Sequence, residues 1–143
     1  MSLYLDSAYV AKCYVTESGS KKVRELVRAE SELHSSAWCV AEVACIFHRH
    51  TRAKSLTREE ALKLQTGFRQ DVENGVWLLS PVSEELLHRV ERAMQQLSPD
   101  VFLRAGNAVH LVTAREAGFS EIWTNDRHLL AAAPHFGLRG RAV

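Results

Sequence analysis

Short apolar runs alternate with helical segments along this chain of 143 residues, and that alternation restricts its fold more than any other feature. The short runs are typical of buried strands, while the segments between them repeat apolar residues at helical spacing. Strands separated by helices can lie parallel in one sheet, because each helix returns the chain to the same edge. The sequence therefore predicts an α/β layer fold with a mostly parallel central sheet, in a single domain spanning residues 1–143.

Cap and turn residues mark the ends of several predicted elements. Thr57 and Glu60 form a capping box that begins one helix, and Gly118 and Pro134 are natural stops for two others. Strands are predicted at residues 3–5, 33–36, 76–79, 122–124 and, at one edge, within 136–143. Helices are predicted at residues 7–15, 20–30, from a serine N-cap at Ser35 or Ser36 to about 54, 57–74, 83–97, 103–116 and 127–133.

Composition restricts the location of the protein more than its function. The formal net charge is only +1, so any binding to phosphate needs a local basic patch. The three cysteines are odd in number and lack CxxC spacing, which predicts buried free thiols in a reducing compartment. No apolar stretch approaches membrane-spanning length, and an acidic residue comes too early for a secretory segment. A cytoplasmic protein that does not bind membranes is expected.

Three acidic residues occupy apolar surroundings in distant parts of the sequence. Glu42 is the only charge in an otherwise apolar run. Asp6 ends the first predicted strand, and Asp126 follows the fourth. A buried carboxylate is costly unless a positive charge meets it. Because acids that follow parallel strands share one edge of the sheet, we expect a single site for a hard divalent cation.

Asn107 belongs with this group, because it heads an inward-facing stripe with Leu111 and Ala114 near the start of a predicted helix. With Asn107 included, four segments in order along nearly the whole chain resemble motifs of the PIN domain, the ribonuclease fold of VapC-type toxins. The resemblance implies a PIN-like three-layer α/β/α sandwich. The four segments are Tyr4–Ala8, Ser36–Glu42, Leu103–Leu111 and Thr124–Ala133.

The resemblance also implies roles for individual residues. Asp6, Glu42 and Asp126 match family acids that bind Mg²⁺ or Mn²⁺, and Asn107 occupies the position of a fourth acid. The family cleaves RNA as the toxin of a type II toxin–antitoxin pair, is silenced by a cognate antitoxin, and commonly forms homodimers. A metal-activated water would be the nucleophile. The hydroxyl groups expected to support the site belong to Ser7 and Thr124.

Asn107 is where this sequence departs from the family pattern, which normally has aspartate there. An amide oxygen can coordinate a cation, but it brings no charge. One carboxylate about 4 Å from a cation contributes roughly 4 kcal/mol at an effective dielectric near 20. The chain is therefore a weakened enzyme, an inactive relative, or a toxin with a deliberately altered aspartate. The rival functions are a non-catalytic module that binds RNA or an antitoxin, and a phosphohydrolase acting on DNA or a small phosphate ester.

Each acid also has an ordinary structural alternative. Glu42 could be a buried acid paired with Arg49 or Arg104. Asp6 and Asp126 could each cap the helix that follows, a role compatible with metal binding.

Other polar and aromatic residues have weaker functional signals. His110 is more typical of a packed, hydrogen-bonded core residue than of a metal ligand. Three arginines beside the site segments are candidates for contacting substrate phosphate, although each could be a solvated surface cation. They are Arg49, Arg104 and Arg127. The tryptophans lie in apolar runs and are expected in the core rather than stacked on bases; they are Trp38, Trp77 and Trp123.

Overall fold

The computed structural model describes residues 1–143, and every predicted strand and helix is present in it with boundaries shifted by a few residues. The strands are β1 (Ser2–Tyr4), β2 (Glu32–Ser36), β3 (Trp77–Ser80), β4 (Glu121–Trp123) and β5 (Arg139–Arg141). The helices are α1 (Ser7–Lys12), α2 (Ser20–Arg28), α3 (Cys39–Arg52), α4 (Arg58–Glu73), α5 (Glu84–Gln96), α6 (Ala105–Glu116) and α7 (Arg127–Ala132). A 3₁₀ turn, η1 (Ala133–Phe136), follows α7.

All strand pairings are parallel, as predicted. One sheet has the order β1-β2-β3, with Leu33 opposite Trp77, and β4 pairs with β5. A single bridge between Leu5 and Trp123 joins β1 to β4, so the five strands follow the order β3-β2-β1-β4-β5. The chain proceeds from β1 toward one edge and later returns to β4 on the other side. This reversal makes the β1/β4 boundary a topological switch point, the place where such sheets form their sites.

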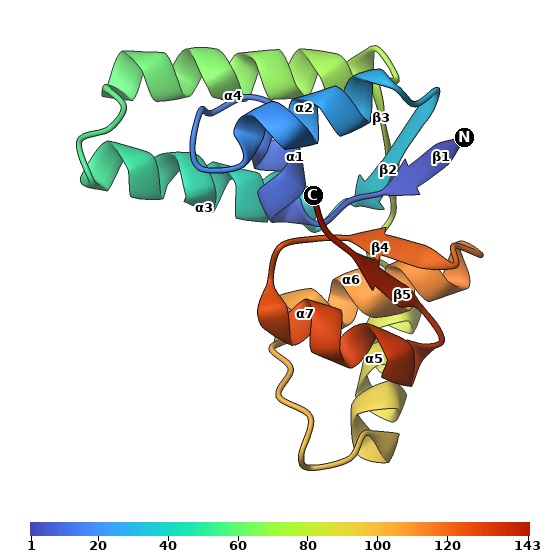
Figure 1. The fold of residues 1–143 in the computed structure, drawn as a ribbon. Coiled ribbons are helices and arrows are strands. Elements are labelled where there is room, and N and C mark those ends of the chain that lie inside the picture. The colour runs from blue at the N-terminus through green and yellow to red at the C-terminus, as the bar shows by residue number, and fades with distance from the viewer.

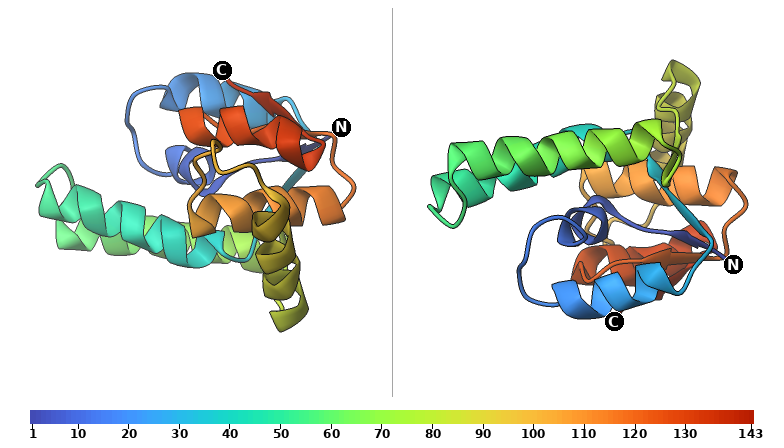
Figure 2. Two further views of the ribbon diagram at one scale, coloured as in Figure 1. Left: turned by 90° about the horizontal axis from the view of Figure 1, so that it is seen from below. Right: turned by 90° about the horizontal axis from the view of Figure 1, so that it is seen from above.

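Helices cover both faces of the sheet and complete the three-layer α/β/α architecture. Figure 2 shows α3, α4 and α6 on one side of the strands, and α2 and α7 on the other. Successive residues at β1 belong to different apolar clusters, because successive side chains of a strand point to opposite faces. Leu3 and Leu5 belong to one apolar cluster with Val43 and Phe68, whereas Tyr4 belongs to a second cluster around α6 and α7.

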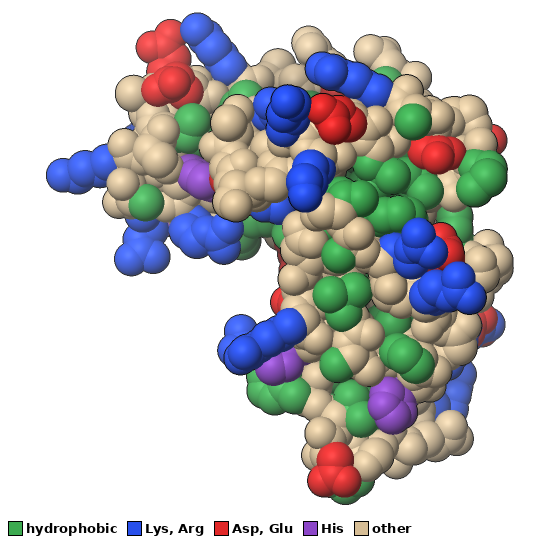
Figure 3. All heavy atoms as spheres, in the orientation of Figure 1, with side chains coloured by type: hydrophobic (Ala, Val, Ile, Leu, Met, Phe, Trp, Pro, Cys, Tyr) green, Lys and Arg blue, Asp and Glu red, His purple; other side chains and the backbone are tan.

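The paired helices α3 and α4 form an arm that extends from the sheet (Figure 1). Its turn is secured at Thr57, whose side chain accepts a hydrogen bond from the Glu60 N–H while the Glu60 carboxylate accepts one from the Thr57 N–H. The predicted capping box is thereby confirmed. Figure 3 shows that the surface is hollowed between this arm and the part of the molecule that holds α7, with Lys and Arg side chains on both edges.

Several predicted helix boundaries differ from the structure. The serine pair lies inside β2, because Ser36 continues the pairing with β3 opposite Ser80; α3 therefore begins after Trp38. Similarly, α6 begins only at Ala105. The first helix ends at Lys12 rather than at residue 15, since the chain turns so that Tyr14 can reach the α4 layer and donate a hydrogen bond to Asp71.

The predictions of buried tryptophans and thiols were only partly right. Trp77 and Trp123 are buried, but Trp38 is 38% exposed at the start of α3. All three cysteines are free; Cys39 is buried, whereas Cys45 is exposed on the outer face of α3. The apolar sequence around Trp38 and Cys45 led to a wrong prediction of burial. A helix buries only one stripe of its surface, so apolar residues on its other sides stay exposed. None of the helices combines the length and apolarity needed to cross a membrane.

Candidate active site

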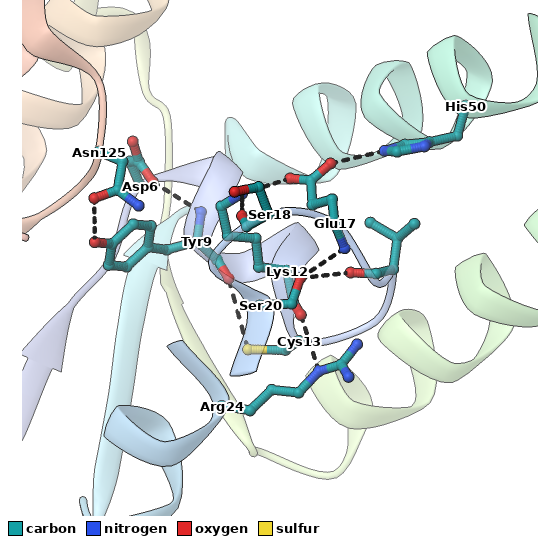
Figure 4. A network of polar contacts seen from close by, with 11 residues as sticks. Asp6, Tyr9, Lys12, Cys13, Glu17, Ser18, Ser20, Arg24, His50 and Asn125 are labelled. Carbon is teal, nitrogen blue, oxygen red and sulfur yellow. Dashed lines mark hydrogen bonds and ion pairs between the residues drawn. The ribbon is translucent and has the colours of Figure 1, made fainter. Parts of the chain in front are cut away.

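Asp6 lies at the switch point, immediately after β1. Its backbone N–H donates to the carbonyl of Trp123 in β4 at 3.1 Å. Its side chain is buried and caps α1, because one carboxylate oxygen accepts a hydrogen bond from the Tyr9 N–H at 2.9 Å. Figure 4 shows this cap beside the hydrogen bond from the Tyr9 hydroxyl to Asn125. The capping alternative is therefore correct, and each carboxylate oxygen keeps a lone pair for another partner.

Thr124 connects two of the predicted acids. Its hydroxyl donates to the second carboxylate oxygen of Asp6 and accepts a hydrogen bond from the Asp126 N–H at 2.9 Å. One oxygen of the Asp126 carboxylate accepts from the N–H groups of His128 and Leu129, so Asp126 caps α7. The hydroxyl expected to support the site is thus fully buried and fixes the chain between two acids from distant segments.

Glu42 comes to the same edge from α3, where two side chains hold one of its oxygens. The Ser7 hydroxyl donates to Oε1 at 2.8 Å, and His110 Nε2 lies 2.9 Å from the same oxygen. The alternative of an arginine partner is wrong, because neither Arg49 nor Arg104 pairs with this carboxylate. Since Ser7 follows Asp6 directly, these contacts bring the α3 acid beside the acid of β1.

His110 is almost fully buried, and its two nitrogens face different partners. Nδ1 lies 3.0 Å from the Tyr4 hydroxyl, and Nε2 lies within 2.9 Å of both Ser7 Oγ and Glu42 Oε1. Burial raises the pKa of the Tyr4 hydroxyl well above its usual value, so this group keeps its proton and can donate to Nδ1. The network therefore assigns a proton to Nε2 of His110, where it points toward Glu42.

This cluster is not a nucleophilic Ser–His–acid triad. Such a triad places the hydroxyl on one imidazole nitrogen and the acid on the other. Here Ser7 and Glu42 share Nε2 of His110, and Nδ1 faces Tyr4 instead. The hydroxyl and imidazole therefore hold Oε1 of Glu42 and fix the orientation of its carboxylate.

The two inner carboxylates differ in their electrostatics. Burial raises the pKa of Asp6, and the charge of Glu42 adds to this, although hydrogen bonds from Thr124 and Tyr9 oppose it. Burial also acts to raise the pKa of Glu42, but the hydrogen bond from His110, with help from Ser7, lowers it overall. An Asp6 carboxylate that is costly to ionise gains most from a nearby cation.

The first turn of α6 packs directly against Glu42. A Cβ atom at Gly106 would lie only 3.0 Å from Glu42 Oε2 and 3.0 Å from the Trp38 indole nitrogen. Glycine therefore permits this close approach. Asn107 follows it and is half-buried, one turn before His110 on the same helix. The predicted stripe is present, since Leu111 and Ala114 are both buried.

The donor set suits a hard cation, but it is not a closed cage. Carboxylate and amide oxygens are the ligands that Mg²⁺ and Mn²⁺ prefer. No group of three or more His, Cys, Asp or Glu side chains is arranged as a ready metal centre. The carboxylates of Asp6, Glu42 and Asp126 are chemically suited to a divalent cation. The fourth position of the set holds Asn107, which has no charge. Such an open set binds a cation more weakly than a four-acid set.

The predicted phosphate contacts lie on both sides of this edge. Arg104 precedes α6, and Arg127 begins α7, directly after Asp126. Arg49 lies in the last turn of α3, farther along the arm. All three side chains are exposed, and none forms an ion pair with a carboxylate. They remain candidates for binding an anion.

Sequence reasoning missed the part that Tyr4 and His110 play. It placed His110 correctly in the core, but it did not connect this residue with Glu42, which is 68 positions away. The available signal was the spacing on α6, since Asn107 and His110 lie one turn apart on the same face.

The parallel three-layer fold, with acids gathered at its switch point, defines a class of α/β protein whose site lies at the carboxyl edge of the sheet. The chain belongs to the PIN domain family, whose sequence profile matches residues 3–134. No match was found among curated proteins.

Several solved structures share the fold at low sequence identity. VapC20 from Mycobacterium tuberculosis, a Sarcin-Ricin loop cleaving toxin, superposes with a TM-score of 0.69 at 13% identity, covering 91% of this chain and 94% of that one. FitAcB from Neisseria gonorrhoeae gives 0.68 at 13% identity, with coverage of 98% and 96%. VapBC2 from Rickettsia felis, bound to a DNA fragment from its promoter, gives 0.67 at 12% identity, with coverage of 100% and 99%. The fold of this chain is thus that of VapC-type toxins.

Proposed function

We propose that this protein is a Mg²⁺- or Mn²⁺-dependent endoribonuclease, the toxin of a type II toxin–antitoxin pair, attenuated by Asn107. The observation that carries the proposal is the joining of three acidic segments at the switch point of a PIN domain. Thr124 connects Asp6 with Asp126, and Ser7 connects the same strand end with Glu42. Structural relatives that include an RNA-loop-cleaving toxin support ribonucleic acid as the substrate.

The metal would be held by Asp6, Glu42 and Asp126, with the amide oxygen of Asn107 as the weak fourth ligand. When bound, a divalent cation lowers the pKa of a water molecule and neutralises charge on the phosphoryl oxygens. Ser7 and His110 hold Oε1 of Glu42, so Oε2 would be the oxygen offered to the cation. Arg104 and Arg127 would attract the phosphate backbone.

The structural similarity to these relatives also indicates which partners the protein has. Two of the related structures are toxin–antitoxin assemblies by name, FitAcB and VapBC2. We propose that a cognate antitoxin also binds this chain, that the active form is a homodimer, and that it acts in the cytoplasm. The mass of the purified protein, alone and with its antitoxin, would test the first two statements.

A comparison of the chain carrying Asn107 with its Asn107→Asp variant tests the proposed activity. Restoring a carboxylate should increase Mn²⁺-dependent cleavage of structured RNA by about tenfold or more, because a full negative charge returns beside the cation. Asp6→Asn serves as the blank, since it removes the buried acid while keeping a similar shape. Equal cleavage by all three proteins, independent of Mn²⁺, would reject the proposal.

Asn107 also favours a second candidate, a PIN-fold module that binds RNA or an antitoxin without cutting. The absence of a group of three metal-binding side chains is consistent with that candidate. Cleavage by the chain carrying Asn107 distinguishes the attenuated nuclease from the binding module. A binding module would stay inactive as the natural sequence and gain cleavage, if at all, only through Asn107→Asp.

A further inference from the structure

An exposed aromatic ring lies in the loop between α5 and α6, just before the site segment of α6. Phe102 is 52% exposed, although both of its neighbours face inward. Val101 and Leu103 pack against the second apolar cluster. The alternation of inward and outward residues fixes the backbone on either side and directs the Phe102 ring to the surface. A single exposed apolar residue is common and carries no meaning alone.

The surroundings of Phe102 distinguish it from an ordinary surface residue. The imidazole of His128 lies against it, with ring centroids 4.4 Å apart and planes tilted by 45°. The guanidinium carbon of Arg104 lies 5.6 Å from the ring centroid. Planar aromatic and guanidinium groups of this kind are the surfaces on which unpaired nucleobases stack. Aromatic and cationic chemistry are therefore combined in one small patch.

This patch adjoins the candidate active site on two sides. Arg104 caps α6 three residues before Asn107, and His128 follows Asp126 by two residues in α7. The loop and α7 border the hollow seen in Figure 3, where Lys and Arg side chains occupy both edges. A phosphate backbone drawn into this hollow would place a neighbouring base within reach of the ring.

We infer that Phe102, His128 and Arg104 form a stacking platform for one unpaired base of a single-stranded RNA whose backbone crosses the acidic edge. The inference rests on the proposed function for its choice of ligand. Stacking of a base on an aromatic side chain tolerates any base, because every base has a flat face. A base inside a duplex already has both faces covered. The platform therefore selects unpaired nucleotides rather than a particular sequence.

Binding to a single-stranded RNA oligonucleotide, measured by fluorescence anisotropy without divalent metal, tests the platform. All variants carry Asp6→Asn, so no cleavage interferes. Phe102→Ala should weaken binding by about tenfold, and Phe102→Trp should restore it, because stacking needs only an aromatic face. Leu62→Ala is the control, since it removes a comparably exposed apolar side chain from α4 and should leave binding unchanged.

A 2-aminopurine placed in the same oligonucleotide reports stacking directly. Its fluorescence should be quenched by the parent and by Phe102→Trp, but not by Phe102→Ala. A fully paired duplex of the same sequence should bind the Phe102 variants equally. Unchanged RNA affinity in Phe102→Ala, as expected of a platform for a protein partner, or an equal loss for duplex and single strand, would overturn the inference.

The two proposals fail separately in these experiments. RNA binding that depends on Phe102 without any Mn²⁺-dependent cleavage would reject the nuclease and keep the platform. Mn²⁺-dependent cleavage by Asn107→Asp, together with single-strand binding that does not depend on Phe102, would keep the nuclease and reject the platform.

Discussion

At the residue scale, the site consists of one acid that is costly to ionise beside another that is well supported. Asp6 is buried near Glu42, and its pKa is raised, first by burial. Glu42 keeps its charge because His110 and Ser7 donate to it. Functional sites commonly keep such destabilising charges, because stability lost in the free protein returns when the ligand binds.

Asp6→Asn should therefore stabilise the metal-free protein. The folded-state pKa of Asp6 lies above its ordinary value of 3.8, so the cost of its charge is absent below that pH and grows as pH rises through the folded pKa. At neutral pH the substitution should raise the free energy of unfolding by about 1 kcal/mol in urea titrations. Asparagine can still cap α1 and face Thr124.

Mn²⁺ provides the control for this prediction. It should raise the urea midpoint of the natural protein, because a ligand that binds only the folded state stabilises it, and leave Asp6→Asn unchanged. A less stable Asp6→Asn protein would show instead that the carboxylate is needed mainly as a hydrogen-bond acceptor.

At the element scale, the arm that carries Glu42 is fastened to the loop between α1 and α2. Glu17 in this loop accepts from Lys12 Nζ at 2.8 Å, and its other oxygen lies 2.8 Å from His50 Nε2 near the end of α3 (Figure 4). The second nitrogen of His50 contacts Ser55 Oγ at 2.8 Å. The loop thus holds the far end of the helix whose beginning bears the site residue.

Glu17→Gln should loosen this connection in a pH-dependent way. Burial acts to raise the pKa of Glu17, but Lys12 and His50 lower it below its ordinary value of 4.5. The stabilisation is therefore present above pH 4.5 and lost as pH falls through the folded-state pKa. We expect a loss of about 1 kcal/mol at pH 7 by urea unfolding, with the difference vanishing in acid.

Glu25→Gln is the matched control, because this exposed residue of α2 has no ion-pair partner. It should unfold like the natural protein at both pH values. If Glu17→Gln shows the same loss at pH 7 and in acid, the effect comes from altered packing rather than from the charge.

At the scale of the whole molecule, two apolar clusters share one sheet. The cluster of α1, α3 and α4 and the cluster of α6 and α7 both include residues of β1, and the Leu5–Trp123 bridge joins the two sets of strands. The candidate active site lies on this same boundary. Separation of the two halves would therefore divide Asp6 from Thr124.

We propose accordingly that the chain unfolds as a single domain. Calorimetry should give one transition with equal calorimetric and van't Hoff enthalpies. Leu129→Ala, in the second cluster, should lower the free energy of unfolding by about 3 kcal/mol and shift the whole transition. Two separate transitions, or a shift in only part of the signal, would contradict a single cooperative unit.

The sequence by itself determined the order of the elements, the parallel sheet and most of the capping positions, although not the N-cap of α3. These features depend on residues within a few positions of one another, such as the Thr57 capping box or the acids that follow β1 and β4. The spacing of apolar residues and the hydrogen bonds of helix caps depend only on nearby residues. A single sequence is therefore enough to locate the strands, helices and caps that they define. The position of His110 in the core was likewise visible from its helix.

Only the tertiary structure decided which distant groups meet. The partners of Glu42 lie 35 and 68 positions away, and the strand order that makes β1 and β4 neighbours has no local signal. The exposure of Trp38 and the outward direction of Phe102 were equally hidden, since which apolar side chains remain outside depends on how the layers pack. Long-range packing selects these contacts, because many pairings satisfy the same local pattern and only one fills the core.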